Sequence, residues 1–221
     1  MKNLSNVGSS SEVVLVKWLS DSTFCLSLKR DGFVFTPGQC VNLGIIGSGI
    51  NREYSTYSSV NNKSRLDFLI KLVEDGAVSN ALSKLKKGDK VQIDGSYGKF
   101  IITDPTNKST KYYFIGTGTG IAPFHSYVTS YPSLNYKIIH GIRTAAESYD
   151  AKDYGKNYVS CTSRDDSGNF AGRVTDYLKC HPIDHKAYYY LCGNSEMINE
   201  VYDILSSAGV NGNQIFTESF F

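Results

Sequence analysis

The sequence has few of the features that mark metal-binding, disulfide-bonded or membrane proteins. Its five cysteines (Cys25, Cys40, Cys161, Cys180 and Cys192) form no C-x-x-C pair, and its four histidines form no H-E-x-x-H pair. We therefore expect no metal site and no built-in iron–sulfur centre. No apolar run approaches the roughly 18 residues that a membrane-spanning helix needs, so we expect no membrane span. The formal net charge of +2 is too small to indicate nucleic acid as a partner.

The N-terminal residues and the cysteine count bear on location. Residues 1–11 are polar and lack the apolar stretch of a secretory signal peptide. An odd number of cysteines fits free thiols in a reducing compartment. We therefore expect a cytoplasmic protein, and a length of 221 residues allows two domains of about 100 residues each.

The two halves of the chain have different hydrophobic patterns. The first half alternates apolar and polar residues in short runs between turn signals, with one helix-like segment at 78–87. Its strand-like runs lie at 23–28, 65–72 and 91–94. In the second half, strand-like runs at 112–115, 136–140, 158–163 and 187–192 alternate with helical patterns, the clearest at 195–208.

These patterns predict a two-domain β + α/β protein. Several short alternating strands indicate an antiparallel β-barrel, and strands that alternate with helices indicate a parallel sheet. The turn-rich segment 104–107 is poor in apolar residues and marks the boundary. We expect a barrel domain over residues 1–106 and an α/β nucleotide-binding domain over 107–221.

A glycine-rich turn is the strongest local signal. The sequence GTGTGIAP at 116–123 follows a strand-like run and precedes a helix-like one. Glycine has no Cβ, so backbone N–H groups can approach a phosphate closely, and a helix N-terminus adds partial positive charge. Such turns also occur as plain connections, so the signal depends on its neighbours.

Arginines follow two neighbouring strands of the predicted parallel sheet. The second half has three arginines, Arg143, Arg164 and Arg173, and its other cations are lysines. A guanidinium matches phosphate oxygens bidentately, whereas an ammonium does not. Three arginines at strand ends would suit the 2′-phosphate of NADP. The alternative is a set of surface salt bridges to the nearby Asp165, Asp166 and Asp176.

Two segments of the first half complete the pattern. In Arg52-Glu53-Tyr54-Ser55, an arginine can neutralise a pyrophosphate, and a tyrosine two residues on lies on the same face of a strand and can stack on a flavin ring. The hydroxyl of Ser55 can reach a ring nitrogen. Residues 76–80 (GAVSN) open the helix-like segment, where backbone amides could bind another phosphate.

In combination these motifs resemble the ferredoxin–NADP reductase family, over the chain from about Gly38 to the C-terminus. The motifs are R-x-Y-S-x-x-S at 52–58, G-x-V-S-N at 76–80, GTGTGIAP at 116–123 and C-G-N at 192–194. The segments HGIR at 140–143, TSR at 162–164 and GRV at 172–174 are similar to the bacterial branch. The resemblance implies FAD and NADP as cofactors, and FAD over FMN rests on it alone.

The resemblance also implies individual roles. On the flavin side, it implies contacts from Arg52, Tyr54, Ser55, Thr56, Gly76, Ala77, Val78, Ser79 and Phe221. On the NADP side, it implies contacts from Gly118, Thr119, Gly120, Arg143, Ser163, Arg164, Arg173, Cys192, Gly193, Asn194 and Met197. Ser55, Cys192 and Glu218 would line the gap crossed by the hydride. Thr56 stands where an aliphatic residue is common in the family.

The chain end differs from many relatives. A glutamate near the C-terminus, here Glu218, usually lies close to the flavin and serves proton exchange in this family. A terminal tyrosine or tryptophan often covers the flavin ring, whereas the candidates here are Phe220 and Phe221. For Cys192, a place beside the nicotinamide C4 competes with that of an ordinary buried thiol at a strand end.

The predicted function is electron transfer between NADP(H) and a one-electron carrier through FAD. Without iron–sulfur cysteines in the chain, the carrier would be a separate ferredoxin or flavodoxin. Lys84, Lys86, Lys87 and Lys90 could dock such an acidic partner, or could simply favour a helix C-terminus and solvent. Alternatives are the reductase component of an oxygenase, a free-flavin reductase and an electron-transfer subunit of a larger complex; a nucleotide-binding regulator without redox activity would not need the flavin-facing set.

Overall fold

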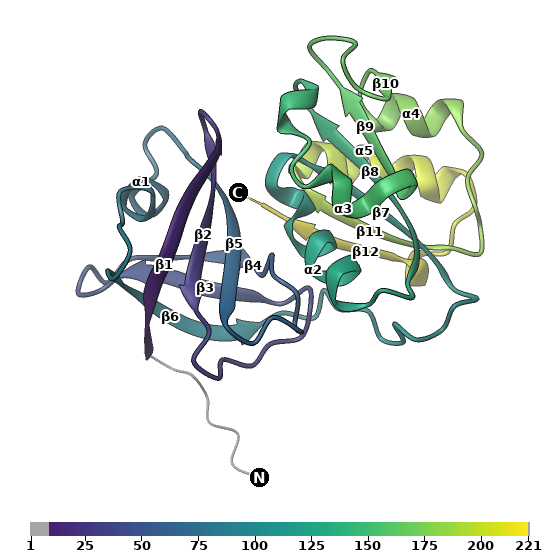
Figure 1. The fold of residues 1–221 in the computed structure, drawn as a ribbon. Helices are drawn as coiled ribbons and strands as arrows, with labels where there is room; N and C mark the ends of the chain where they lie inside the picture. Colours follow the sequence, from purple (N-terminus) through teal and green to yellow (C-terminus); the bar gives the residue numbers. More distant parts are fainter. Residues whose placement is uncertain (1–8, 221) are drawn as a thin grey trace. The chain divides into compact units, whose positions relative to one another are not determined.

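A computed structural model describes residues 9–220 as two compact units, each built on a six-stranded sheet (Figure 1). Unit 1 contains the chain up to Ile102 together with His125–Ser130. Unit 2 contains Thr103–Phe124 and the chain from Tyr131 onward. The predicted antiparallel first sheet and parallel second sheet are confirmed. The predicted domain boundary at 106/107 stays a prediction.

The sheet of unit 1 is antiparallel, in the order β4-β3-β6-β1-β2-β5. Its strands are β1 (Ser9–Ser20), β2 (Thr23–Lys29), β3 (Cys40–Ile45), β4 (Asn51–Ser55), β5 (Arg65–Lys71) and β6 (Lys90–Tyr97). The two edge strands are joined just beyond β4, where Tyr57 N–H donates to Asp67 O on β5 (2.8 Å). This bond closes the sheet toward a barrel.

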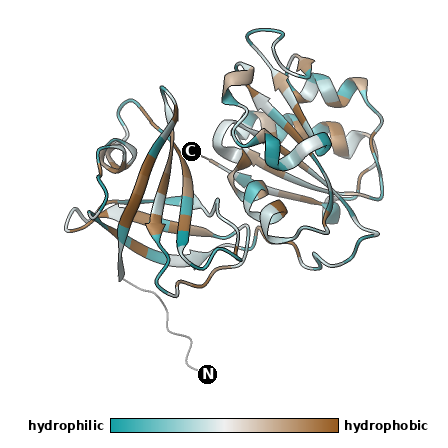
Figure 2. Cartoon of the chain, in the orientation of Figure 1, coloured by the Kyte–Doolittle hydropathy of each residue, from teal (hydrophilic) through white to brown (hydrophobic). Residues whose placement is uncertain are grey.

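Alternating apolar residues build the core of unit 1. In β2 and β5, the partners Leu26 and Phe68, and likewise Leu28 and Leu66, are opposite each other and fully buried. Burial of each such side chain contributes about 1.5–3 kcal/mol. Figure 2 shows hydrophobic residues concentrated on these strands. The strand expected over 65–72 is therefore confirmed as β5, and its alternate apolar residues are buried.

The helix of unit 1 is shorter than predicted. Helix α1 spans Ala77–Ser83, whereas the pattern predicted a helix over 78–87. Lys86 N–H donates to the Asp89 side chain (2.7 Å), and Gly88 has φ +96°, a conformation that glycine adopts without strain. These turn interactions follow the end of the helix, so Lys86 and Lys87 lie on a loop and Lys90 begins β6.

The sheet of unit 2 is parallel, in the order β10-β9-β8-β7-β11-β12. Its strands are β7 (Lys111–Thr117), β8 (Asn135–Ile142), β9 (Tyr158–Thr162), β10 (Phe170–Ala171), β11 (Tyr188–Gly193) and β12 (Ile215–Ser219). Its helices are α3 (Ala151–Tyr154), α4 (Val174–Cys180) and α5 (Ser195–Ser207), with short 3-10 turns η1 (Gly118–Ile121), η2 (Ala145–Glu147), η3 (Gly155–Asn157) and η4 (Gly212–Gln214). Helix α2 (Ala122–Ser130) begins in unit 2, and its residues from His125 onward belong to unit 1.

Helices cover both faces of this sheet. Residues of α4 and α5 pack on Ile115, Ile139 and Leu191 in one buried cluster. The start of α2 lies on the other face, where Phe124 stacks on Phe114 with ring centroids 5.1 Å apart. Successive side chains of β7 point to opposite faces of the sheet. Because helices cover both faces, the side chains on both are apolar, and the strand is a continuous hydrophobic run. Over residues 9–220, no helix is long and apolar enough to span a membrane.

Candidate cofactor sites

The glycine-rich turn of unit 2 connects β7 to α2 through η1, at the carboxyl end of a central strand. A Cβ built on Gly120 would lie 2.3 Å from Cys192 O, so no other residue fits without moving backbone. Gly118 has φ +53°, and a Cβ built on it would meet nothing within 4 Å. The turn is therefore closed against β11 on one side and open at Gly118. An open turn at this edge of a parallel sheet suits a nucleotide.

A second turn, after β11, is hydrogen-bonded to the first and packs closely against it. Thr117 Oγ1 accepts a hydrogen bond from Asn194 N–H (3.1 Å), and a Cβ on Gly193 would lie 2.5 Å from the same oxygen. The Asn194 side chain caps α5 by accepting from Met197 N–H (3.2 Å). The structure thus brings Gly120, Gly193 and Asn194 together. Thr117, which links them, was not predicted.

The backbones of the arginines expected at the strand ends lie side by side, just beyond neighbouring strands. Arg164 N–H donates to Arg143 O (3.1 Å), beyond the last pairs of β8 and β9. Gly172 N–H donates to Thr162 O (2.8 Å), which brings Arg173 to the same end of β9. All three arginines and Ser163 are exposed. The sheet therefore places a group of cations at the edge that carries the glycine-rich turn.

Two acidic side chains near these arginines accept hydrogen bonds from a hydroxyl or a backbone N–H group. Side-chain ion pairs of the described residues include Lys29 with Asp31 and Lys111 with Asp184. The Asp165 side chain accepts from Ser167 (2.7 Å), and the Asp176 side chain accepts from Arg173 N–H (2.9 Å). These contacts do not favour the alternative in which the arginines serve surface salt bridges.

Cys192 lies inside the sheet of unit 2. It pairs with Gly116 of β7 on one side and with Glu218 of β12 on the other, and it is 0% exposed. Burial raises the pKa of the thiol well above its usual range, and the nearby Glu218 adds to the shift. The thiol is therefore held in its neutral form at physiological pH.

Several predicted side chains are already engaged within the protein. Met197 packs in the core of unit 2. Thr56 is fully buried, and its Oγ1 donates to Gln39 O (3.1 Å). Cofactor contacts from these two residues stay predictions, and their side chains have clear structural roles. Phe221 lies outside the described residues, while Phe220 N–H donates to Gly193 O (2.8 Å).

A buried histidine, His140, supports the glycine-rich turn and was not predicted to do so. His140 of β8 is fully buried, with Nε2 2.7 Å from Gly118 O and Nδ1 2.8 Å from Tyr158 Oη. Burial lowers the pKa of His140 to about 4, so the ring is neutral at pH 7. The sequence carried one signal, a histidine at a strand end three residues before Arg143.

In unit 1, the flavin-type motif lies on the edge strand β4. Arg52 and Tyr54 share one face of the strand. Arg52 is exposed, and its Nη1 donates to the carbonyl oxygen of the preceding residue, Asn51 (2.8 Å). Tyr54 packs against the core, and burial raises its pKa to about 12, against the opposing effect of Arg52. Ser55 is buried opposite Cys40. An exposed cation beside a fixed aromatic ring suits a flavin nucleotide.

The start of α1 offers backbone donors rather than side chains. A Cβ on Gly76 would lie 2.7 Å from Ser79 Oγ, which in turn accepts from Val73 N–H (3.2 Å). The side chain of Val78 is buried in the core. No side chain of the described residues caps this helix start. Ala77 and its neighbours can therefore offer first-turn N–H groups to a phosphate.

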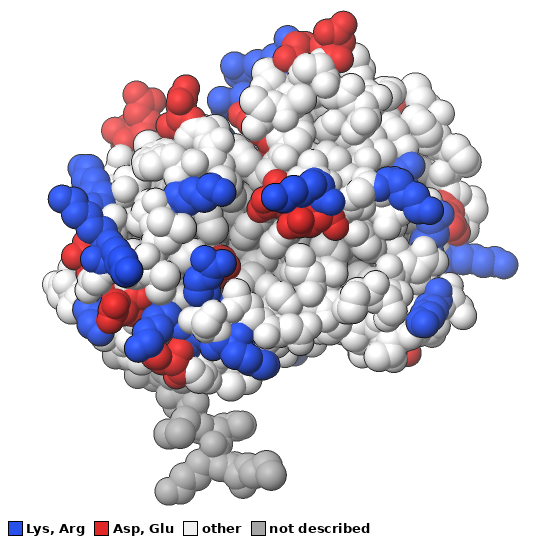
Figure 3. All heavy atoms as spheres, viewed as in Figure 1, with Lys and Arg blue, Asp and Glu red and all other residues white. Residues whose placement is uncertain are grey.

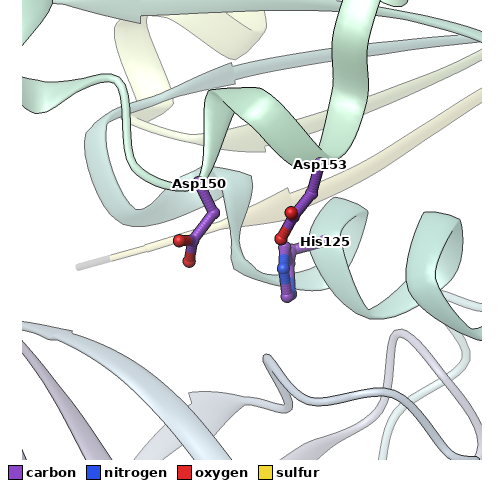
Figure 4. A group of neighbouring side chains, drawn as sticks. All are labelled: His125, Asp150 and Asp153. Carbon is purple, nitrogen blue, oxygen red and sulfur yellow. The ribbon is translucent and has the colours of Figure 1, made fainter.

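Figure 4 draws three side chains of types that can bind metals, His125 of α2 with Asp150 and Asp153 at the start of α3. His125 is engaged within unit 1, where its ring stacks on Tyr57 (centroids 4.0 Å apart) and Nδ1 lies 2.7 Å from Tyr57 O. Asp150 belongs to unit 2, where its carbonyl accepts from Asp153 N–H (2.8 Å). These contacts assign no metal, and the expectation of none stays a prediction.

Family models match both halves of the chain. An oxidoreductase FAD-binding domain matches residues 13–102, and an oxidoreductase NAD-binding domain matches residues 114–203. In sequence, the chain is 28% identical to the toluate 1,2-dioxygenase electron transfer component of Pseudomonas putida, over 96% of this chain and 68% of that protein. It is 27% identical to the flavodoxin/ferredoxin–NADP reductase of Escherichia coli, over 86% of this chain and 87% of that protein.

Solved structures show the same fold. The Amycolatopsis cytochrome P450 reductase GcoB superposes with a TM-score of 0.85 at 25% identity, over 96% of this chain and 69% of that one. A ferredoxin–NADP+ reductase from Neisseria gonorrhoeae with bound FAD and NADP also gives 0.85, at 23% identity, over 96% and 98%. With an FAD-binding domain followed by an NAD-binding domain, this chain belongs to the ferredoxin–NADP reductase family of flavoprotein oxidoreductases.

Proposed function

We propose that this protein uses FAD to pass electrons between NADP(H) and a separate one-electron carrier, a ferredoxin or flavodoxin, in the cytoplasm. The observation that carries the choice of NADP is the backbone pairing of Arg143 with Arg164 at one sheet edge. The Escherichia coli relative, matched over 87% of its length, supports the carrier. The five free cysteines fit a reducing compartment.

The NADP-side residues bind and orient the nucleotide. Arg143, Arg164 and Arg173 would bind the 2′-phosphate through charge-assisted hydrogen bonds, with Ser163 adding a hydroxyl. The turn Gly118–Gly120 would bind the pyrophosphate with backbone N–H groups, aided by the start of α2. The hydrogen bond from Asn194 N–H to Thr117 Oγ1 would keep both turns in place.

The flavin-side residues bind FAD. Arg52 would neutralise the pyrophosphate, and first-turn amides from Gly76 to Ser79 would add hydrogen bonds. Tyr54 would stack on the isoalloxazine, because its ring is already fixed against the barrel core. Ser55 would hydrogen-bond near flavin N5.

The bound cofactors supply the chemistry, a hydride transfer between nicotinamide C4 and flavin N5 with electrons released singly to the carrier. The protein's contribution is to hold the reacting atoms at near-attack distance and to exclude water. Cys192 would position the nicotinamide as a neutral thiol, since burial keeps its pKa high. Glu218, its neighbour in the sheet, would hold or exchange a proton.

Replacing Glu218 by glutamine should slow hydride transfer about tenfold to a hundredfold, because the amide keeps the shape but can neither take up nor release a proton near pH 7. Stopped-flow bleaching of the flavin by NADPH would measure the rate. Glu200→Gln, on the exposed side of α5, is the matched control. An unchanged rate in Glu218→Gln would remove this residue from the mechanism.

A surface for an acidic carrier is available on unit 1. Lys84, Lys86, Lys87 and Lys90 are all exposed, and α1 ends before them. Cationic side chains gather over unit 1 on the face drawn in Figure 3, with acidic groups between them. Such a surface would speed association with a negatively charged protein at low salt.

The reductase component of an oxygenase is the second candidate. The toluate dioxygenase electron transfer component and the propane 2-monooxygenase reductase component of Mycolicibacterium smegmatis both match this chain. The chain spans 60% of the length of the latter. Turnover with a purified ferredoxin or flavodoxin, compared with turnover by an oxygenase component, would separate the two functions.

The visible spectrum of the purified protein, recorded without oxygen, tests the proposal. Flavin bands that bleach with NADPH well before NADH would support it. A colourless protein that reduces added flavin would instead favour a free-flavin reductase. A flavoprotein indifferent to both nucleotides would contradict the proposal and favour an electron-transfer subunit.

A further inference from the structure

His140 is a fully buried titratable side chain that the proposed mechanism leaves without a role. It lies on β8, which has β7 and β9 on its two sides. One ring nitrogen, Nε2, is 2.7 Å from the carbonyl oxygen of Gly118, and the other, Nδ1, is 2.8 Å from the hydroxyl of Tyr158. Both ring nitrogens are thus engaged, one of them by the first residue of the η1 turn.

The partners determine where the ring proton sits. A carbonyl oxygen can only accept, so Nε2 carries the proton and donates to Gly118 O. Nδ1 of the neutral ring must then accept, and Tyr158 supplies the donor. Burial raises the pKa of Tyr158 to about 12, so its hydroxyl keeps its hydrogen. The donors run in one direction, from Tyr158 to His140 to Gly118.

This chain of hydrogen bonds fixes a peptide bond in the glycine-rich turn. In a planar trans peptide, the C=O and the following N–H point in opposite directions. When His140 holds the Gly118 carbonyl on the interior side, the N–H of Thr119 must point to the other side. A flipped peptide would present a carbonyl oxygen there, which repels an anion. Gly118 has φ +53° and no side chain, so no side-chain packing of its own holds this peptide in place.

We propose that His140, oriented by Tyr158, is a positioning residue that holds the Gly118–Thr119 peptide with its N–H directed at the pyrophosphate of a bound dinucleotide. The inference rests on the proposed function, in which this turn binds the pyrophosphate of NADP(H). It assigns no contact between His140 and the nucleotide. Its consequence is selective: pyrophosphate binding depends on His140, and 2′-phosphate binding by the arginines does not.

Two ligands and three variants test the proposal on the flavin-loaded protein. NADP+ contains both the pyrophosphate and the 2′-phosphate, whereas adenosine 2′-monophosphate has only the latter. His140→Leu removes both hydrogen bonds at similar volume. His140→Gln keeps an amide N–H that can reach the position of Nε2. Tyr158→Phe leaves the ring free to adopt the other tautomer. Calorimetric titration gives the Kd of each ligand, and thermal melting reports folding.

We expect His140→Leu to weaken NADP+ binding about tenfold to a hundredfold, because a hydrogen bond to a charged group is lost. Binding of adenosine 2′-monophosphate should stay within about twofold of the wild type, and His140→Gln should restore most of the NADP+ affinity. Tyr158→Phe should weaken NADP+ binding in the same selective way.

Equal loss of both ligands in His140→Leu, or no loss of NADP+, would overturn the inference. If His140→Leu fails to fold, Tyr158→Phe decides: unchanged NADP+ affinity overturns the inference, and a selective loss supports it. A wild-type protein that binds neither ligand would overturn the proposed function, and the inference with it.

Discussion

Alanine in place of Gly120 is expected to lower kcat/KM for NADPH by about 100-fold or more, because a displacement of the order of 1 Å at a reacting site has that effect. The new Cβ would lie 2.3 Å from Cys192 O and 2.9 Å from Gly193 Cα. Both neighbours are backbone atoms, so no side-chain rotation relieves the clash. Either the glycine-rich turn or the turn after β11 must move. Steady-state kinetics with NADPH would measure the loss.

Gly212→Ala is the matched control. Gly212 has ordinary φ, and the nearest atom to its Cβ is Tyr202 Oη at 3.6 Å, a normal contact. We expect this variant to keep wild-type kinetics. The flavin absorption of Gly120→Ala should also persist, because the residues assigned to FAD lie in unit 1. Wild-type kinetics in Gly120→Ala would show that the close packing of the two turns does not matter for activity.

Alanine in place of Arg164 is expected to raise KM for NADPH about tenfold to a hundredfold and to leave NADH use within about twofold. A charge-assisted hydrogen bond contributes about 1.5–3 kcal/mol, which sets this range. Arg164 is exposed and bonded through its backbone to Arg143, so its guanidinium is available to a ligand. NADH lacks the 2′-phosphate and so loses no partner. The ratio of kcat/KM values for the two nucleotides is the measurement.

Arg65→Ala provides the control for net charge. Arg65 begins β5 of unit 1 and is exposed, so its removal also deletes one positive charge. A similar fall in NADPH use in both variants would indicate a general electrostatic effect. Equal losses with NADPH and NADH in Arg164→Ala would contradict the assignment of this arginine to the 2′-phosphate.

Local pattern predicted β2, β5 and β6 of unit 1 and the four central strands of unit 2, but it missed β1, β3 and β12. The alternation of Leu66, Phe68 and Ile70 identified β5, and the helical spacing of Met197, Ile198 and Val201 identified α5 to within one residue. The failure at α1 has a local cause that pattern does not capture. The side chain of Asp89 bonds to the backbone of Lys86 and forms a turn where the apolar spacing continued.

The motifs predicted which residues to consider, but not how each is used. Met197 and Thr56 were grouped with cofactor residues, and the structure shows their side chains in a core and in a hydrogen bond to Gln39. His140 and Thr117 were passed over, although both hold the glycine-rich turn. Their partners are 22 and 77 residues away in the chain, so no local pattern could reveal them.

The sequence alone determined that an antiparallel domain precedes a parallel α/β domain, because the type of sheet depends on local periodicity. Residue chemistry indicated the glycine and arginine positions, and the resemblance that the motifs carry indicated FAD and NADP. The tertiary structure decided what depends on contacts across strands. It made Cys192 a buried neutral thiol between β7 and β12, and it joined Arg164 to Arg143. It also turned His140 from a strand residue into the support of Gly118, because parallel pairing brings strand ends together that lie far apart along the chain.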